Sequence, residues 1–153
     1  LSEVAQDFWD FMFSDQAQAL VSEEGYVAVD SDAPEYTSSA LDGKISIVGS
    51  TSVQPIMERI AQAYREKNPN VVIEITAPGS GAGVTAAIDQ TADIGMASRE
   101  LSDDEQSQVT ETAALAIDGI AVIVNNDNPT DDLSLEDIAG IYSGDLTVWD
   151  AVQ

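Results

Sequence analysis

Three short polar stretches in this chain carry residue types that can bind a small anion. They are Gly49-Ser50-Thr51-Ser52, then Gly79-Ser80-Gly81-Ala82-Gly83, and finally Ser98-Arg99. Hydroxyl groups of Ser and Thr are neutral hydrogen-bond donors, and Arg adds a charged, forked donor. Three such stretches in succession are a stronger signal than any one of them, and they indicate a site for a small oxyanion.

The elements around these stretches place them where anions bind. Each follows an apolar run, at 44–48, 71–76 and 92–97, and the first two precede helical patterns at 56–67 and 84–90. The chain thus repeats strand, loop and helix twice and begins a third unit. This order predicts an open α/β sheet. At the carboxyl ends of such strands, free helix N–H groups and the positive end of the helix dipole attract anions.

Each stretch also has an interpretation that involves no ligand. Thr51 or Ser52 could simply cap the following helix, and the glycines of the second stretch could form only a flexible turn. Arg99 could make a surface ion pair with Glu100 or Asp103, or it could order its loop or face an anion. The spacing fits neither the dinucleotide-binding glycine motif nor a Walker A loop.

Composition excludes several classes of function. Lys and Arg number 5 against 28 Asp and Glu among 153 residues, so the formal charge is −23. Nucleic acid and anionic membrane surfaces are therefore poor partners. The chain has no Cys and no His, which rules out thiol catalysis, a Ser-His-Asp triad and the usual zinc sites. No apolar run reaches the roughly 18 residues of a membrane span. We expect no cofactor, no metal and no enzyme activity; a phosphoryl-handling enzyme has little support.

The acidic residues are interpreted as structural. We expect Asp93, on the third apolar run, to bond a neighbouring backbone group or Ser rather than to act as a base or metal ligand. The runs Asp103-Asp104-Glu105 and Asp131-Asp132 lack the ligand spacing of a calcium-binding loop and are interpreted as acids at helix starts.

The flanking regions are predicted as follows. The apolar spacing of residues 1–24 predicts an amphipathic helix that is broken near Ser14-Asp15. Residues 26–29 are predicted to form a short strand. Residues 30–43 are polar and form the best linker candidate. Ile117–Val124 reads as a buried strand. Ser134 is expected to cap a helix over 135–142.

Taken together, these motifs resemble those of the phosphate-specific substrate-binding proteins of bacterial ABC transporters. The resemblance rests on 49–55, 79–84 and 92–101, and on 118–125 followed by 135–149. It implies an α/β fold, a three-layer α/β sandwich that forms a single lobe of a type II periplasmic-binding-protein-like fold, with permuted segment order. The matching positions imply a phosphate site made of Thr51, Ser52, Ser80, Gly81, Ser98 and Arg99. Some relatives carry a proton-sensing acid where this chain has Arg99.

The resemblance also implies how the chain is divided. Residues 8–29 look like the C-terminal end of the family, so we interpret 1–29 as a helix and strand of a preceding unit that packs on the lobe. Residues 30–43 would be a linker and 44–153 the first lobe, from a parent with tandem units. The second-lobe part of the site would follow Trp149.

The expected function is binding of inorganic phosphate or a similar oxyanion for uptake, at a partial site completed by a second lobe. The expected partners are the oxyanion and, through the full-length parent, an ABC permease, with no nucleic acid and no membrane insertion of this fragment. We expect an extracellular or cell-surface location, with signal and anchor outside this chain. The alternative is a signalling or adhesion module of the same fold that binds a protein partner near Trp9 or Tyr36.

Overall fold

The computed structural model describes residues 1–149. It divides into one unit over Leu1–Gly119 and a second that starts at Ile120. The sequence alone does not predict this division, since it predicts a continuous lobe over 44–153. The two units are described separately.

The first unit is built on a parallel sheet of three strands. In chain order they are β2 (Gly43–Gly49), β3 (Val71–Thr76) and β4 (Ile94–Met96), and β2 lies in the middle. Ile45 of β2 pairs with Ile73 of β3, and Ile47 pairs with Ile94 of β4. All three strands run in the same direction, so their carboxyl ends meet at one edge of the sheet. The three strands predicted from the apolar runs at 44–48, 71–76 and 92–97 are confirmed.

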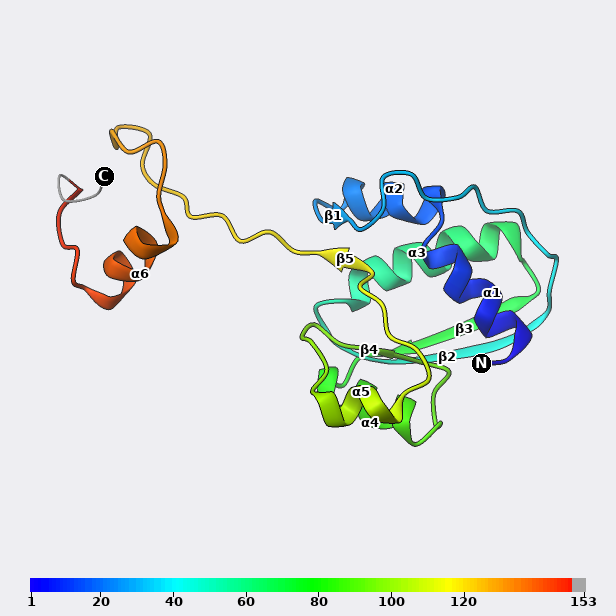
Figure 1. The fold of residues 1–153 in the computed structure, drawn as a ribbon. Coiled ribbons are helices and arrows are strands. Elements are labelled where there is room, and N and C mark those ends of the chain that lie inside the picture. The colour runs from blue at the N-terminus through cyan, green and yellow to red at the C-terminus, as the bar shows by residue number, and fades with distance from the viewer. Residues whose placement is uncertain (150–153) are drawn as a thin grey trace. The chain divides into compact units, whose positions relative to one another are not determined.

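Helices cover both faces of this sheet. On one side lie α1 (Glu3–Met12) and α3 (Gln54–Lys67), and on the other lie α4 (Ser80–Ile88) and α5 (Asp103–Gln108) (Figure 1). The side chains of β2 alternate accordingly: Ile45 and Ile47 are buried towards α1 and α3, whereas Ser46 and Val48 are only half-buried. The predicted three-layer α/β sandwich is therefore confirmed.

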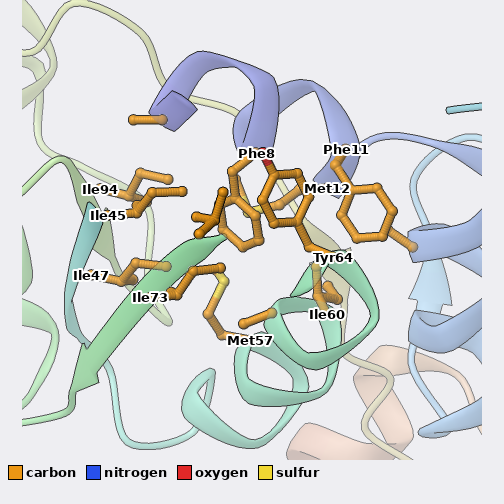
Figure 2. Packing of buried hydrophobic residues seen from close by; sticks show 14 of the residues in the cluster. Phe8, Phe11, Met12, Ile45, Ile47, Met57, Ile60, Tyr64, Ile73 and Ile94 are labelled. Atoms are coloured by element: carbon orange, nitrogen blue, oxygen red, sulfur yellow. The ribbon is translucent and has the colours of Figure 1, made fainter. Parts of the chain in front are cut away.

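The core lies between the sheet and the N-terminal helices (Figure 2). Phe8 meets Tyr64 edge-on, with ring centroids 5.0 Å apart, and Phe11 lies 5.3 Å from the same ring. All three side chains are fully buried. The predicted break between the two N-terminal helices is present, because Ser14 caps α2 (Asp15–Glu23) by accepting from the Ala17 N–H. Residues 1–23 thus supply a large share of the core.

A polar cluster ties the 30–43 segment to the helices. The Asp7 carboxylate accepts hydrogen bonds from the hydroxyls of Tyr36, at 2.6 Å, and Tyr64, at 2.7 Å. The Asn68 amide donates to the Tyr36 hydroxyl at 2.9 Å and accepts from Ser38. Burial raises the pKa of both phenols, and the Asp7 carboxylate adds to this. This segment, predicted as a linker, is bonded to α1 and α3.

The chain leaves the first unit through a two-stranded antiparallel pair of β1 (Val27–Ala28) and β5 (Ala116–Ile117). The predicted buried strand over 117–124 is wrong, since Ile120 is 96% exposed and Ile123 is 89% exposed. A strand is buried on both faces only where other layers cover it, and the described residues provide no cover for these two side chains.

The second unit contains α6 (Leu135–Ser143). The predicted cap is confirmed: Ser134 and Asp137 form a reciprocal capping box. Asp131 and Asp132, interpreted as acids at a helix start, lie in the loop that precedes α6. A hollow of about 310 Å³ lies within this unit and is lined mainly by apolar side chains, including Ile138 and Ile141. Across the described residues, the helices are too short or too polar to cross a membrane.

Candidate ligand-binding site

The ends of the three parallel strands are held together by backbone hydrogen bonds. The Gly79 N–H, after β3, donates to the Gly49 carbonyl at the end of β2, over 2.8 Å. The Ser50 N–H donates to the Met96 carbonyl of β4 over 3.0 Å. The first polar stretch is therefore fixed to both of its neighbours, as the topology requires of central strand β2.

Side-chain bonds join the second and third stretches. The Ser80 hydroxyl accepts from the Ser98 N–H at 3.1 Å, and the two hydroxyl oxygens lie 3.2 Å apart. These residues are 18 positions apart in sequence. The structure thus brings together two of the hydroxyl groups that the sequence analysis placed in one site.

The second stretch is the first turn of α4, not a loop before it. The predicted helix start at Val84 is four residues late, because α4 begins at Ser80 after Gly79, whose φ is +125°. Within residues 1–149, the N–H groups of Ser80, Gly81 and Ala82 have no intramolecular acceptor. Such groups, with the positive end of the helix dipole, are suited to hold an anion.

Glycine at position 83 allows α4 to lie directly against the sheet. A Cβ at Gly83 would lie 2.6 Å from the Gly49 Cα, 2.6 Å from the Met96 carbonyl oxygen and 2.7 Å from the Val48 carbonyl oxygen. Gly95 of β4 faces the same contact, since a Cβ there would come within 2.5 Å of the Gly83 oxygen. Close packing of backbone on backbone therefore sets how near the α4 N-terminus comes to the strand ends.

Thr51 and Ser52 form an exposed turn between β2 and α3. The alternative in which one of them only caps α3 does not hold: the N-cap is Val53, which makes no side-chain bond, and the Gln54 N–H donates to the Ser50 carbonyl. Among the described residues, neither hydroxyl has a hydrogen-bond partner. Both donors are therefore available to a ligand, and the buried Ser50 makes the turn that presents them.

Arg99 is bound to α5 by Glu105, a carboxylate that the sequence analysis interpreted only as an acid at a helix start. Its two terminal nitrogens each lie 2.8 Å from an oxygen of Glu105, and Nη1 also donates to the Glu100 carbonyl. The alternative of an ion pair with Glu100 or Asp103 named other partners, because the first turn of α5 brings Glu105 to the guanidinium. The hydrogen bonds from Arg99 lower the pKa of the Glu105 carboxyl to about 2. Arg99 thus orders its loop, one of the roles predicted.

Asp93 has the structural role expected of it. Its carboxylate accepts from the Ser46 N–H at 2.8 Å and from the Ser46 hydroxyl at 2.9 Å, while its own N–H donates back to Ser46. It joins β2 to the segment before β4 on the α4 face. Within the part of the chain that the structure describes, no group of acidic side chains is arranged to hold a metal ion.

Sequence reasoning missed the close packing of Gly83 on the sheet and the contact of Glu105 with Arg99. Nothing local marks Gly83, since its role depends on the strands against which it packs. Glu105 had a visible signal, because Ser102-Asp103-Asp104-Glu105 is a capping-box sequence, and the structure forms that box.

Comparisons with known proteins identify the family to which the chain is similar. Residues 34–153 match the family model described as a PBP superfamily domain. The chain is 48% identical over its full 153 residues to "Phosphate-binding protein PstS 2" of Streptococcus pneumoniae TIGR4, and 44% identical over 147 residues to the protein of that name from Streptococcus agalactiae 2603 V/R. It covers 52% and 50% of these proteins, so it spans about half the length of the curated relatives it matches.

Solved structures of phosphate ABC transporter binding proteins are also similar to this chain. A phosphate-binding protein of a phosphate ABC transporter from S. pneumoniae TIGR4 superimposes with a TM-score of 0.89 at 48% identity, over 100% of this chain and 59% of that one. A putative phosphate ABC transporter substrate-binding protein with bound phosphate, from Clostridium perfringens, gives 0.55 at 44% identity over 71% of this chain and 44% of that one. The family model matches residues 34–153, which is most of the chain. The chain therefore belongs to the PBP superfamily.

Proposed function

We propose that this chain binds inorganic phosphate, or a similar oxyanion, as one half of a site that a second lobe completes. The observation that carries the proposal is the joining of three strand ends beside the unused N–H groups of α4. Thr51 and Ser52 add two hydroxyl donors without internal partners, and Ser80 and Ser98 add a bonded pair. The names of the relatives, and the bound phosphate of the C. perfringens protein, support this ligand.

The charge of −23 does not oppose this function. Surface carboxylates act on an anion through water and salt, and their effect is largely screened beyond about 8–10 Å. Backbone N–H groups and hydroxyls act at hydrogen-bond distance, where a closed site excludes water. Local dipoles, not net charge, therefore decide whether the anion binds.

The proposed role is delivery of the bound anion to an ABC permease, outside the membrane and at the cell surface, with no chemical conversion. The names of the relatives describe binding proteins of transporters, which favours this role over an enzyme. The alternative of a protein-binding module near Trp9 or Tyr36 is not favoured. Trp9 packs against the core, and the Tyr36 hydroxyl is engaged by Asp7 and Asn68.

The test is calorimetric titration of phosphate into the full-length protein, with sulfate as a second ligand. We expect the triple substitution Thr51→Ala, Ser52→Ala and Ser98→Ala to abolish phosphate binding. A matched control, Ser31→Ala with Thr110→Ala, removes two exposed hydroxyls elsewhere in the first unit and should leave affinity unchanged. Unchanged affinity in the triple variant would show that these hydroxyls are not the site.

Titration of residues 1–153 alone adds a second result. A half-site predicts weak or undetectable binding, because the lobe described here contributes only part of the donors. Tight and phosphate-selective binding by this fragment would contradict the need for a second lobe.

A further inference from the structure

The guanidinium of Arg99 is held by one edge and has another edge unused. Three of its N–H donors are taken: both on Nη1, by Glu105 and the Glu100 carbonyl, and one on Nη2, by Glu105. A guanidinium has five such donors in a fixed plane. Those left are on Nε and Nη2, and among the described residues neither has an acceptor. These two N–H groups are parallel, and such a fork matches two oxygens of a phosphate.

Glu105 is itself held in place. Its Oε2 accepts from the Ser102 N–H at 2.9 Å and from the Ser102 hydroxyl at 3.1 Å, in the capping box that begins α5. The carboxylate is therefore fixed from its own helix before it meets Arg99, and its side chain is 25% exposed against 46% for Arg99. A long, exposed Arg side chain otherwise samples many rotamers.

We infer that Glu105 is a positioning residue for the anion site. It fixes Arg99 by the end of its guanidinium so that the Nε–Nη2 edge stays free for an oxyanion beside Ser98. This inference rests on the proposed function and extends it to a residue that does not touch the ligand. A carboxylate placed this way also offsets the charge of Arg99, so the site gains a directed pair of donors rather than a free positive charge.

The opposite role would be competition, in which Glu105 occupies Arg99 and the anion must displace it. The bonding pattern favours positioning, because Glu105 and Glu100 together take the end of the guanidinium and leave a complete fork. The two roles predict opposite changes in phosphate affinity when Glu105 is removed. Loss of a positioning carboxylate weakens phosphate binding, whereas loss of a competitor strengthens it.

The test is a double-mutant cycle in the full-length protein, read as the phosphate Kd from calorimetry. We expect Glu105→Ala to raise the Kd about three- to tenfold, the cost of ordering one long side chain at binding. In an Arg99→Ala background, the same substitution should change the Kd by less than about twofold, since Glu105 acts through Arg99. Asp103→Ala is the matched control, because it removes an exposed carboxylate from the same first turn of α5 while Arg99 keeps its bonds to Glu105 and the Glu100 carbonyl, and it should leave the Kd within about twofold.

Other results overturn the inference. If Arg99→Ala binds phosphate as well as the unsubstituted protein, Arg99 is not a donor and Glu105 has nothing to position, although the proposed function stands. Tighter binding by Glu105→Ala, or equal weakening in both backgrounds, also refutes it. If the unsubstituted protein binds no phosphate, the proposed function fails and this inference fails with it.

Discussion

Gly83 offers a sharp test of how α4 is placed. Substitution by Ala puts a Cβ within 2.6 Å of the Gly49 Cα and of the Met96 carbonyl oxygen. Carbon atoms in contact normally lie about 3.5–4.0 Å apart, so α4 must retreat by about 1 Å. These neighbours are backbone atoms of two strands, which cannot rotate away. Such overpacking costs about 1–3 kcal/mol, and the better helix propensity of Ala returns up to about 1 kcal/mol.

We therefore expect Gly83→Ala to lower the free energy of unfolding by about 1–2 kcal/mol. Gly81→Ala is the control: a Cβ there meets nothing within 4 Å, so it should stabilise by up to about 1 kcal/mol. Urea denaturation of the purified protein, followed by circular dichroism at 25 °C, measures both. A retreat of α4 also stretches the 3.1 Å bond from the Ser98 N–H to Ser80. Equal or greater stability of Gly83→Ala would refute this account of the packing.

Two further predictions concern carboxylates that hold other groups. Arg99 lowers the pKa of Glu105 in the folded protein to about 2, so the stabilisation that this pair gives is present above the unfolded-state pKa and is lost as pH falls from about 4.5 to 2. Urea midpoints measured across this range should fall less steeply for Glu105→Gln than for the unsubstituted protein, and parallel curves would contradict the pairing. Asp7 accepts from two tyrosine hydroxyls, so Asp7→Ala should cost about 1–3 kcal/mol because it leaves buried Tyr64 unsatisfied. Tyr64→Phe keeps Asp7 bonded to Tyr36 and should cost about 1 kcal/mol; a larger loss than for Asp7→Ala would show that Asp7 is not the anchor.

The strands and the order of the loops could be predicted because their signals are local. Val71–Thr76 is a β-branched run, and its boundaries agree with β3. Ser14, Ser102 and Ser134 all cap the helices that follow them, since a hydroxyl before an apolar or acidic turn is a cap signal in any fold. The joining of the strand ends followed from the topology of parallel sheets.

The features that sequence reasoning missed depend on distant neighbours. The glycines after Gly79 lie in the first turn of α4, and Gly83 and Gly95 allow the helix and sheet backbones to touch, whereas glycine in isolation indicates a loop. The prediction of a buried strand over 117–124 was wrong for the same reason. An apolar run shows that a strand can be buried but not that another layer exists to cover it. The interpretation of 1–29 as the tail of a preceding unit stays a prediction. The match to the S. pneumoniae relative includes this segment, because it covers all of the chain.

The hydrogen bonds at the strand ends divide the polar groups there into two sets. Gly79, Ser50 and Ser98 use their backbone N–H groups on Gly49, Met96 and Ser80, and these bonds fix the three stretches to one another without a ligand. The hydroxyls of Thr51 and Ser52 and the first N–H groups of α4 take no part in this. In the proposed anion site, groups that are already held in this way would need little further ordering on binding. Arg99 differs from these groups because its side chain is long and flexible. It needs a separate anchor to be as well ordered as they are, and Glu105 on its capped helix supplies that anchor.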